Sequence, residues 1–142
     1  MDPFVVQVLS VGVNIWIPVD PVPASRPRVT RWGVYYGKRY TRFRKEVSEI
    51  LGRKDLPKGL PLSGPLKAIV KFYLAKPKSS TREWPNGDLD NYLKTLDSFN
   101  GIFWEDDDQI IEFEAHKEFI TKPVEGFNEP GIMILLRRPT KE

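Results

Sequence analysis

The sequence contains no cysteine and only one histidine, His116. A chain without thiols forms neither disulfides nor thiolate metal sites. A single imidazole also leaves no room for a multi-histidine zinc site or for most histidine-based catalytic triads. These classes of site are therefore excluded.

Long apolar runs are absent as well. The apolar segment 4–9 is too short to span a bilayer, and it lacks the basic residues that begin a signal peptide. We therefore expect a soluble, cytoplasmic protein without a membrane partner. A chain of 142 residues is long enough for one domain with a core and too short for two domains that each bury a sizeable core. We expect a single domain over residues 1–142.

The charges are segregated along the chain, which the net charge of +3 conceals. The segment from Pro21 to Lys45 holds eight Lys and Arg residues and no acid. The segment from Asp88 to Glu118 holds ten acidic residues against only two lysines. A basic region that holds phosphates beside an acidic cluster that holds metal is typical of a nuclease. The alternative, two solvated faces of opposite sign, remains open on charge alone.

Hydrophobic spacing predicts the secondary structure. The predicted strands are 4–9, 13–18, 66–75, a segment that starts at 110, and 131–136; the predicted helices are 41–51 and 91–101. Residues 25–36 interleave arginines with aromatics and are predicted to form a loop and a hairpin that turns at Gly33. The order β-β-α-β-α-β-β indicates an α+β fold, with two main helices packed on a mixed or antiparallel sheet. The wholly apolar strand 131–136 is expected in a central or well-covered position.

Two groups of acids flank the second predicted helix. Asp88 and Asp90 stand on either side of one leucine at its start, and four consecutive acids occupy 105–108 after its end. We expect folding to bring the two groups together. Carboxylates gathered that closely repel one another and stay ionised only beside a strong positive charge, for which a divalent metal is the simplest candidate. Asp88 and Asp90 can converge on one ion if Asp88 lies in extended backbone before the helix.

The same stretch carries a family resemblance. The runs DLDNYLK (88–94), LDSFNG (96–101) and FWEDDDQI (103–110) resemble the RusA-like Holliday junction resolvases. That family is marked by D-x-D-N-x-x-K, a short helix that ends near N-G, and a D-D-x-Q-[IV] entry into a strand. The run IPVDPVPASRPR (17–28) is similar to the family's opening, so the matches touch roughly residues 15 to 119. Between Lys94 and Asp97 the chain is one residue shorter than the family pattern, so the resemblance carries no role over to Asp97.

The resemblance implies a RusA-like fold and a metal-dependent, structure-specific endonuclease that cleaves four-way DNA junctions as a homodimer. A junction presents paired symmetric strands, so a two-fold dimer suits it. By the family pattern the metal ligands are Asp88, Asp90 and Asp107, with Asp106 as the second choice for the third position. Magnesium prefers oxygen ligands of this kind, and Mn²⁺ is a possible substitute. Asn91 and Gln109 are expected to support the ligand carboxylates, with a turn cap and an ordinary surface residue as their respective alternatives.

Lys94 has two interpretations. It follows Asp90 by four residues, so the two could form an ordinary helical ion pair worth ~0.3–0.5 kcal/mol. The resemblance instead puts its ammonium on the scissile phosphate or the leaving oxygen, as a catalytic residue beside the three carboxylates. Trp104 is expected in the core rather than as a wedge in DNA.

Basic residues of the N-terminal half are predicted to bind DNA, because arginine fits phosphate and the neighbouring aromatics offer stacking faces. They are Arg26, Arg28, Arg31, Lys38, Arg39 and Arg42. Two other functions remain open from the sequence. One is a branched-DNA-binding module without catalysis, and the other is a metal-dependent nucleotide phosphohydrolase, which would not need the basic and aromatic segment.

Overall fold

Strand β5 (Leu66–Leu74) lies in the middle of the fold and shows why the sheet forms here. Its alternate residues Leu66, Ala68, Val70 and Phe72 are buried on one face, as a half-covered strand requires. In the computed structural model, which describes residues 3–120 and 129–140, β5 pairs with an antiparallel strand on one side and a parallel strand on the other.

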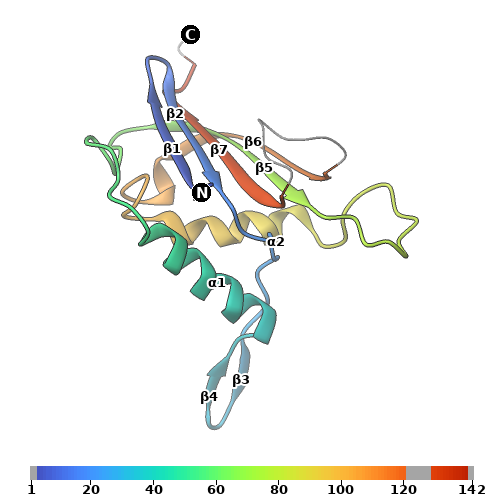
Figure 1. Cartoon of the computed structure of the whole chain (residues 1–142). Coiled ribbons are helices and arrows are strands. Elements are labelled where there is room, and N and C mark those ends of the chain that lie inside the picture. The colour runs from blue at the N-terminus through green and yellow to red at the C-terminus, as the bar shows by residue number, and fades with distance from the viewer. Residues whose placement is uncertain (1–2, 121–128, 141–142) are drawn as a thin grey trace.

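The main sheet has the order β1-β2-β7-β5-β6 and is mixed (Figure 1). Strands β1 (Val5–Leu9), β2 (Gly12–Ile17), β7 (Gly131–Arg137) and β5 are successively antiparallel. Strand β6 (Ile110–Phe119) pairs in parallel with β5 and forms one edge. The apolar strand β7 is central, as predicted. The α+β fold with a mixed sheet is also confirmed.

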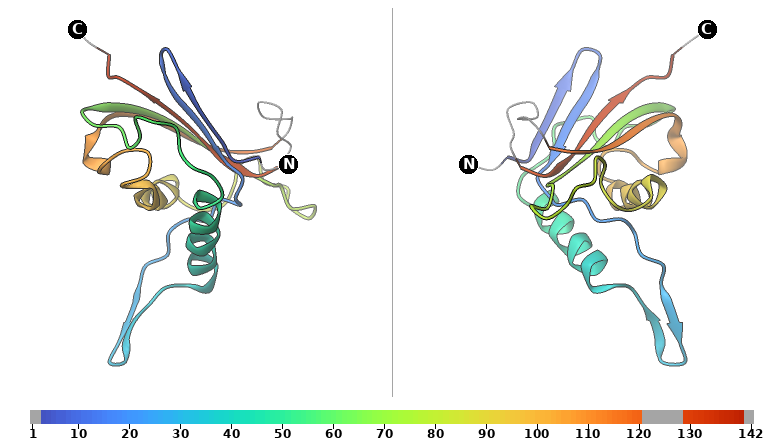
Figure 2. Two further views of the ribbon diagram at one scale, coloured as in Figure 1. Left: turned by 60° about the vertical axis from the view of Figure 1, so that its left-hand side comes forward. Right: turned by 90° about the vertical axis from the view of Figure 1, so that its right-hand side faces the viewer.

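The helices cover one face of this sheet (Figure 2). They are α1 (Lys38–Leu51), α2 (Leu89–Leu93) and the 3-10 helix η1 (Lys94–Phe99), which continues α2. Helix α1 presents Tyr40, Phe43, Val47 and Ile50 to the core, at the i, i+3, i+7 and i+10 spacing of one helical face. Phe99 and Trp104 are both fully buried and meet edge to face, so Trp104 is a core residue as predicted.

The structure corrects two local predictions and adds one short element. The second helix is not one α-helix over 91–101, because it tightens into 3-10 geometry at Lys94 and ends at Phe99. A further 3-10 turn, η2 (Asp107–Gln109), precedes β6. The hairpin does not turn at Gly33, which is already the first residue of its second strand; the turn is Arg31-Trp32.

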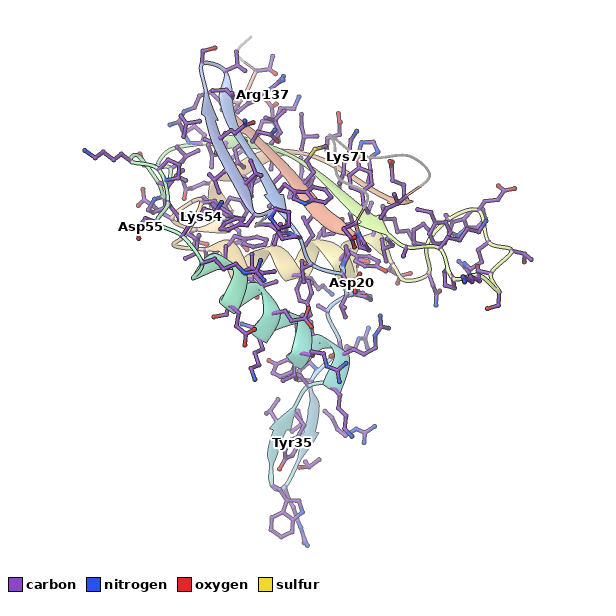
Figure 3. All side chains as sticks on the ribbon, viewed as in Figure 1. Asp20, Tyr35, Lys54, Asp55, Lys71 and Arg137 are labelled. Carbon is purple, nitrogen blue, oxygen red and sulfur yellow. The ribbon has the colours of Figure 1, made fainter. Side chains whose placement is uncertain are left out.

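That hairpin forms an arm separate from the main sheet. Its strands are β3 (Arg28–Thr30) and β4 (Gly33–Tyr35), and we call residues 25–37 the arm. It extends away from the helices and the sheet in all three views (Figures 1 and 2), and Figure 3 shows Tyr35 far from the body of the molecule. Every residue from Arg26 to Arg39 is exposed.

Among the described residues, no helix combines the length and the apolar character that crossing a bilayer would require.

Candidate active site and nucleic-acid interface

Asp88 lies in extended backbone directly before α2, with φ −75° and ψ 136°. Its backbone carbonyl accepts hydrogen bonds from the N–H groups of Asn91 and Tyr92, at 3.0 and 3.3 Å, and so begins the helix. Its side chain makes no capping hydrogen bond, and the residue is exposed. The carboxylate is therefore free to bind a cation. Asp90 is also exposed, in the first turn of α2.

The loop that leads into α2 is held by two side chains from other parts of the fold. Lys117 on β6 donates hydrogen bonds to the carbonyl oxygen of Pro85, at 2.7 Å, and to that of Gly87. The hydroxyl of the buried Tyr92 donates to the carbonyl oxygen of Asn86 at 2.8 Å. Gly87 has φ +94°, and a Cβ there would meet the Tyr92 ring at 3.2 Å, so this position favours glycine.

An open pocket of about 430 Å³ lies beside the free carboxylate. Asp88 and Asn91 line it together with Arg39 from the first turn of α1. Lys94 donates a hydrogen bond to Asn91 Oδ1 at 3.3 Å, which directs its ammonium toward this end of the helix. Both Asp90 and Lys94 are described, and they form no ion pair with each other. The ordinary helical pair is therefore not the state of Lys94 in this structure.

The second acidic group lies in the turn that enters β6. Asp106 caps η2: its Oδ1 accepts from the N–H of Asp108 at 3.4 Å, and its own N–H donates to Gln109 Oε1 at 2.7 Å. These two contacts form a capping box, so the Asp106 carboxylate is part of the turn. Asp107 occupies the first position of η2 and is exposed.

Gln109 takes a role that the sequence did not suggest. Its amide nitrogen donates to the carbonyl oxygens of Leu62, at 2.9 Å, and Gly64, at 2.8 Å. With its oxygen on Asp106 N–H, the amide is engaged by backbone groups and braces the acidic turn against the segment before β5. It contacts no ligand carboxylate.

The pKa of the Asp107 carboxyl group lies above its ordinary value. Desolvation by the surrounding protein is the largest cause, followed by a hydrogen bond with Asp106 and by the negative charges of Asp106, Asp97 and Asp108. Because Asp107 is exposed, solvent screens these effects. Asp97 thus belongs electrostatically to the Asp107 group, and a cation bound there would relieve the repulsion among these acids.

The two acidic groups lie at opposite ends of the helical segment. Five residues of α2 and six of η1 span about 20 Å at ordinary helical rises. The sheet gives a similar value. Lys117 contacts the backbone before Asp88, and it lies seven residue steps along β6 from Ile110, near Asp107, which corresponds to roughly 23 Å. Within the described ranges, no three Asp, Glu or His side chains lie close enough to hold one metal ion. The expectation that one folded chain gathers both groups is wrong.

The predicted DNA-binding residues form a continuous exposed series. Three lie on the arm and three in the first turns of α1: Arg26, Arg28, Arg31, Lys38, Arg39 and Arg42. The base of the arm is closed by a hydrogen bond from the N–H of Gly37 to Ser25 Oγ at 3.1 Å. The N–H of Ala24 donates to the carbonyl of Asn91 at 2.8 Å, which ties the arm to α2 beside the pocket.

A family model, that of endodeoxyribonuclease RusA, matches residues 18–135 of the chain. The chain belongs to the RusA endodeoxyribonuclease family. A comparison with curated proteins found no match. RusA membership supports, in general terms, endonuclease action on Holliday junctions in DNA recombination. The matched range includes both acidic groups, Lys94 and the whole basic series.

Sequence reasoning missed Lys117 as part of this candidate site. In the sequence, Lys117 is one of only two lysines in the acidic segment from Asp88 to Glu118, and nothing else distinguishes it. Its signal is positional: in the register with β5 it stands opposite Phe72, on the covered face, where a lysine must find internal acceptors. Those acceptors are backbone carbonyls about thirty residues away along the chain.

Proposed function

We propose that this protein is a Mg²⁺-dependent endonuclease that cleaves four-way DNA junctions as a homodimer. The observation that carries the proposal is the free carboxylate of Asp88, held on a braced loop, at a pocket shared with Asn91 and Arg39. The exposed basic series leads to the same pocket from the arm. A carboxylate beside a path for phosphates is the arrangement that phosphodiester hydrolysis needs.

The donor set suits magnesium, which prefers carboxylate oxygens and keeps several of its waters. Asp88 and Asp90 would supply two ligands and Asp107 the third, with Mn²⁺ as a possible substitute. Desolvation is the largest cause of the raised pKa of Asp107, and the charges of Asp106, Asp97 and Asp108 add to it. A cation bound there would relieve the repulsion among these carboxylates. When bound, the ion would supply charge neutralisation at the phosphate and a more acidic water.

The other residues at the pocket bind and orient the DNA strand. Arg39 would hold a phosphate oxygen through its planar fork. Lys94, directed toward the start of α2 by Asn91, would place its ammonium on the scissile phosphate and stabilise the charge that develops there. Lys117 would keep Asp88 in position by holding the carbonyls before it.

A second copy of the chain supplies the missing third carboxylate in this proposal. The two groups that one chain holds about 20 Å apart lie at opposite ends of a single helical segment. In a two-fold dimer with antiparallel segments, the Asp107 end of one copy approaches the Asp88 end of the other. Two such sites would arise together, one for each of the symmetric strands of a junction.

The edge strand β6 offers a surface for this pairing. It runs for ten residues without a neighbour on its outer side among the described residues, and it exposes 63% of Ile111 and 45% of Phe113. The unpaired backbone of an edge strand is a template for another strand. Antiparallel pairing of two β6 edges about an axis near Ala115 sets the start of one strand opposite the end of the other. Because Lys117 links the end of β6 to the backbone before Asp88, the Asp107 of one copy comes near the Asp88 of its partner.

The test is cleavage of a labelled four-way junction, a linear duplex and a single strand, with Mg²⁺ and with EDTA. The proposal predicts symmetric cuts in the junction alone, abolished by EDTA or by Asp88→Asn. Junction binding in EDTA should survive the substitution. Binding without cleavage in Mg²⁺ or Mn²⁺ would instead indicate a non-catalytic binding module, and hydrolysis of free nucleotides without junction cutting would indicate a phosphohydrolase.

A further inference from the structure

The arm carries apolar and aromatic side chains that no part of the described fold covers. Val29 and Trp32 are each 75% exposed, and Val34, Tyr35 and Tyr36 are exposed by 49–56%. An isolated two-stranded hairpin is only marginally stable in water, so burying these side chains inside the protein would be expected if the arm had a purely structural role. Its exposure indicates that its partner is another molecule.

The tip of the arm pairs an arginine with a tryptophan. The turn consists of Arg31 and Trp32, and the Arg31 guanidinium lies 4.6 Å from the centre of the Trp32 ring. Thr30 fixes this turn: its hydroxyl accepts from the N–H of Trp32 at 3.1 Å and donates to the carbonyl of Gly33 at 3.2 Å. The indole is thus presented at the far end of a short, closed hairpin with a cation against one face.

The positive charge around the tip of the arm indicates which class of molecule binds there. No acid occurs between Pro21 and Lys45, whereas the exposed arm and the start of α1 carry a continuous series of cations. A polyanion fits this surface, and an aromatic ring beside an arginine is suited to stacking on a base. One face of the hairpin repeats the combination, since Arg28 stands opposite Tyr35, whereas the other face pairs Val29 with Val34.

We propose that Trp32 stacks on an unstacked base at the branch point of a four-way junction, so that the arm tip selects junctions over linear duplexes. The inference rests on the proposed action on junctions. In a linear duplex every base is stacked on both faces, and a lone indole finds no free face. At a branch point the stack is interrupted, and the ring can take the place of a neighbouring base. Trp32 therefore adds affinity for junctions and little for duplex DNA, while the arginines contribute to the binding of both kinds of DNA.

The experiment measures fluorescence of 2-aminopurine placed at the branch point of a junction, and binding affinity for junction and duplex, all in EDTA so that no cutting occurs. Wild-type protein should change the 2-aminopurine signal. Trp32→Ala should abolish that change and weaken junction binding by about 5–150-fold, the range for one lost base–aromatic stack, with duplex affinity within about twofold. Trp32→Phe should restore part of both.

Trp84 provides a matched control, since it is 59% exposed on a different loop and also lies against an arginine, Arg82. Trp84→Ala should leave the branch-point signal in place. The inference is overturned if Trp32→Ala behaves as wild type, or if it weakens junction and duplex binding equally. It is also overturned if Trp32→Ala only changes the oligomeric state, because the tip would then contact a second copy of the chain. If any of these results is found but the wild-type protein still cuts junctions in Mg²⁺, the inference about Trp32 fails and the proposed function stands. If the wild-type protein neither binds nor cuts junctions, the inference and the proposed function both fail.

Discussion

The ammonium of Lys117 on β6 donates a hydrogen bond to the backbone carbonyl of Gly87, the residue before Asp88. The same ammonium donates a second hydrogen bond to the backbone carbonyl of Pro85. An edge strand of the sheet thereby sets the position of a carboxylate that a short helix presents. The position of the Asp88 carboxylate is therefore set by β6 as well as by the helix that carries the acidic motif.

Lys117→Met should therefore slow cleavage by about 10–100-fold, because a small displacement of Asp88 is enough to disturb the reacting geometry. Junction affinity in EDTA should stay unchanged, since the basic series is untouched. Single-turnover cleavage at saturating enzyme measures this effect. Lys71→Met is the matched control: it changes a lysine of the adjacent strand β5 (labelled in Figure 3) whose register position falls on the opposite face of the sheet. Equal rates for the two variants would contradict the positioning role.

Lys94→Met separates catalysis from ordinary helix chemistry. If Lys94 stabilises charge at the phosphate, single-turnover cleavage should fall by ~10²-fold or more, with little change in folding or affinity. Lys94→Arg should rescue poorly, because a planar fork does not replace a compact ammonium. If Lys94→Met cuts at a rate within about threefold of wild type, Lys94 is an ordinary surface residue of the helix and has no catalytic role.

The elevated pKa of Asp107 makes a prediction about stability. The folded state binds this proton more tightly than the unfolded state does. Stability is therefore lost as pH rises from the ordinary aspartate pKa through the higher pKa of the folded state, and the ionised group is unfavourable at pH 7. Asp107→Asn should therefore raise the melting temperature at pH 7 in EDTA, though only slightly, because solvent screens the charge of this exposed group. The gain should vanish below roughly pH 3, where both states are protonated. Asp55→Asn, on the connector after α1, serves as the control, and a variant less stable than wild type at pH 7 would oppose the account.

The arm arginines should set the salt dependence of DNA binding. Each lost phosphate contact lowers the slope of log K against log salt by about 0.9 for duplex DNA. The double variant Arg26→Ala, Arg28→Ala should weaken binding and flatten that slope, whereas Arg137→Ala, at the far end of β7 in Figure 3, should not. An unchanged slope would mean that the arm faces solvent and another surface holds DNA.

Local spacing predicted most of the fold because each element buries one face. The alternation in β5 and the helical spacing of Phe43, Val47 and Ile50 identified their buried sides correctly. Whether the sheet was mixed could not be read locally, since the parallel pairing of β5 with β6 depends on how the chain crosses over between them. Hydrophobic spacing could not distinguish the α-helix α2 from the 3-10 helix η1 that continues it from Lys94.

The site was less predictable for a related reason. The motif predicted which carboxylates bind metal, and Asp88 does lie in the extended backbone that would let it converge with Asp90. Spacing along the sequence could not say how the helical segment is oriented between the two acidic groups. That segment holds Asp88 and Asp107 apart within one chain. The roles of Lys117 and Gln109 were hidden because their partners are backbone carbonyls about 30 and 45 residues away.

The most direct test of the two-chain site mixes two inactive proteins. Asp88→Asn and Asp107→Asn should each fail to cut a junction in Mg²⁺. If each site takes Asp88 from one copy and Asp107 from the other, the mixed dimer has one site with both substitutions and one with neither. Mixing and re-equilibrating equal amounts should then restore single-strand cutting of the junction, up to about a quarter of the wild-type number of sites. No restored cutting, with mixed dimers shown to form by a tag on one variant, would contradict the two-chain site.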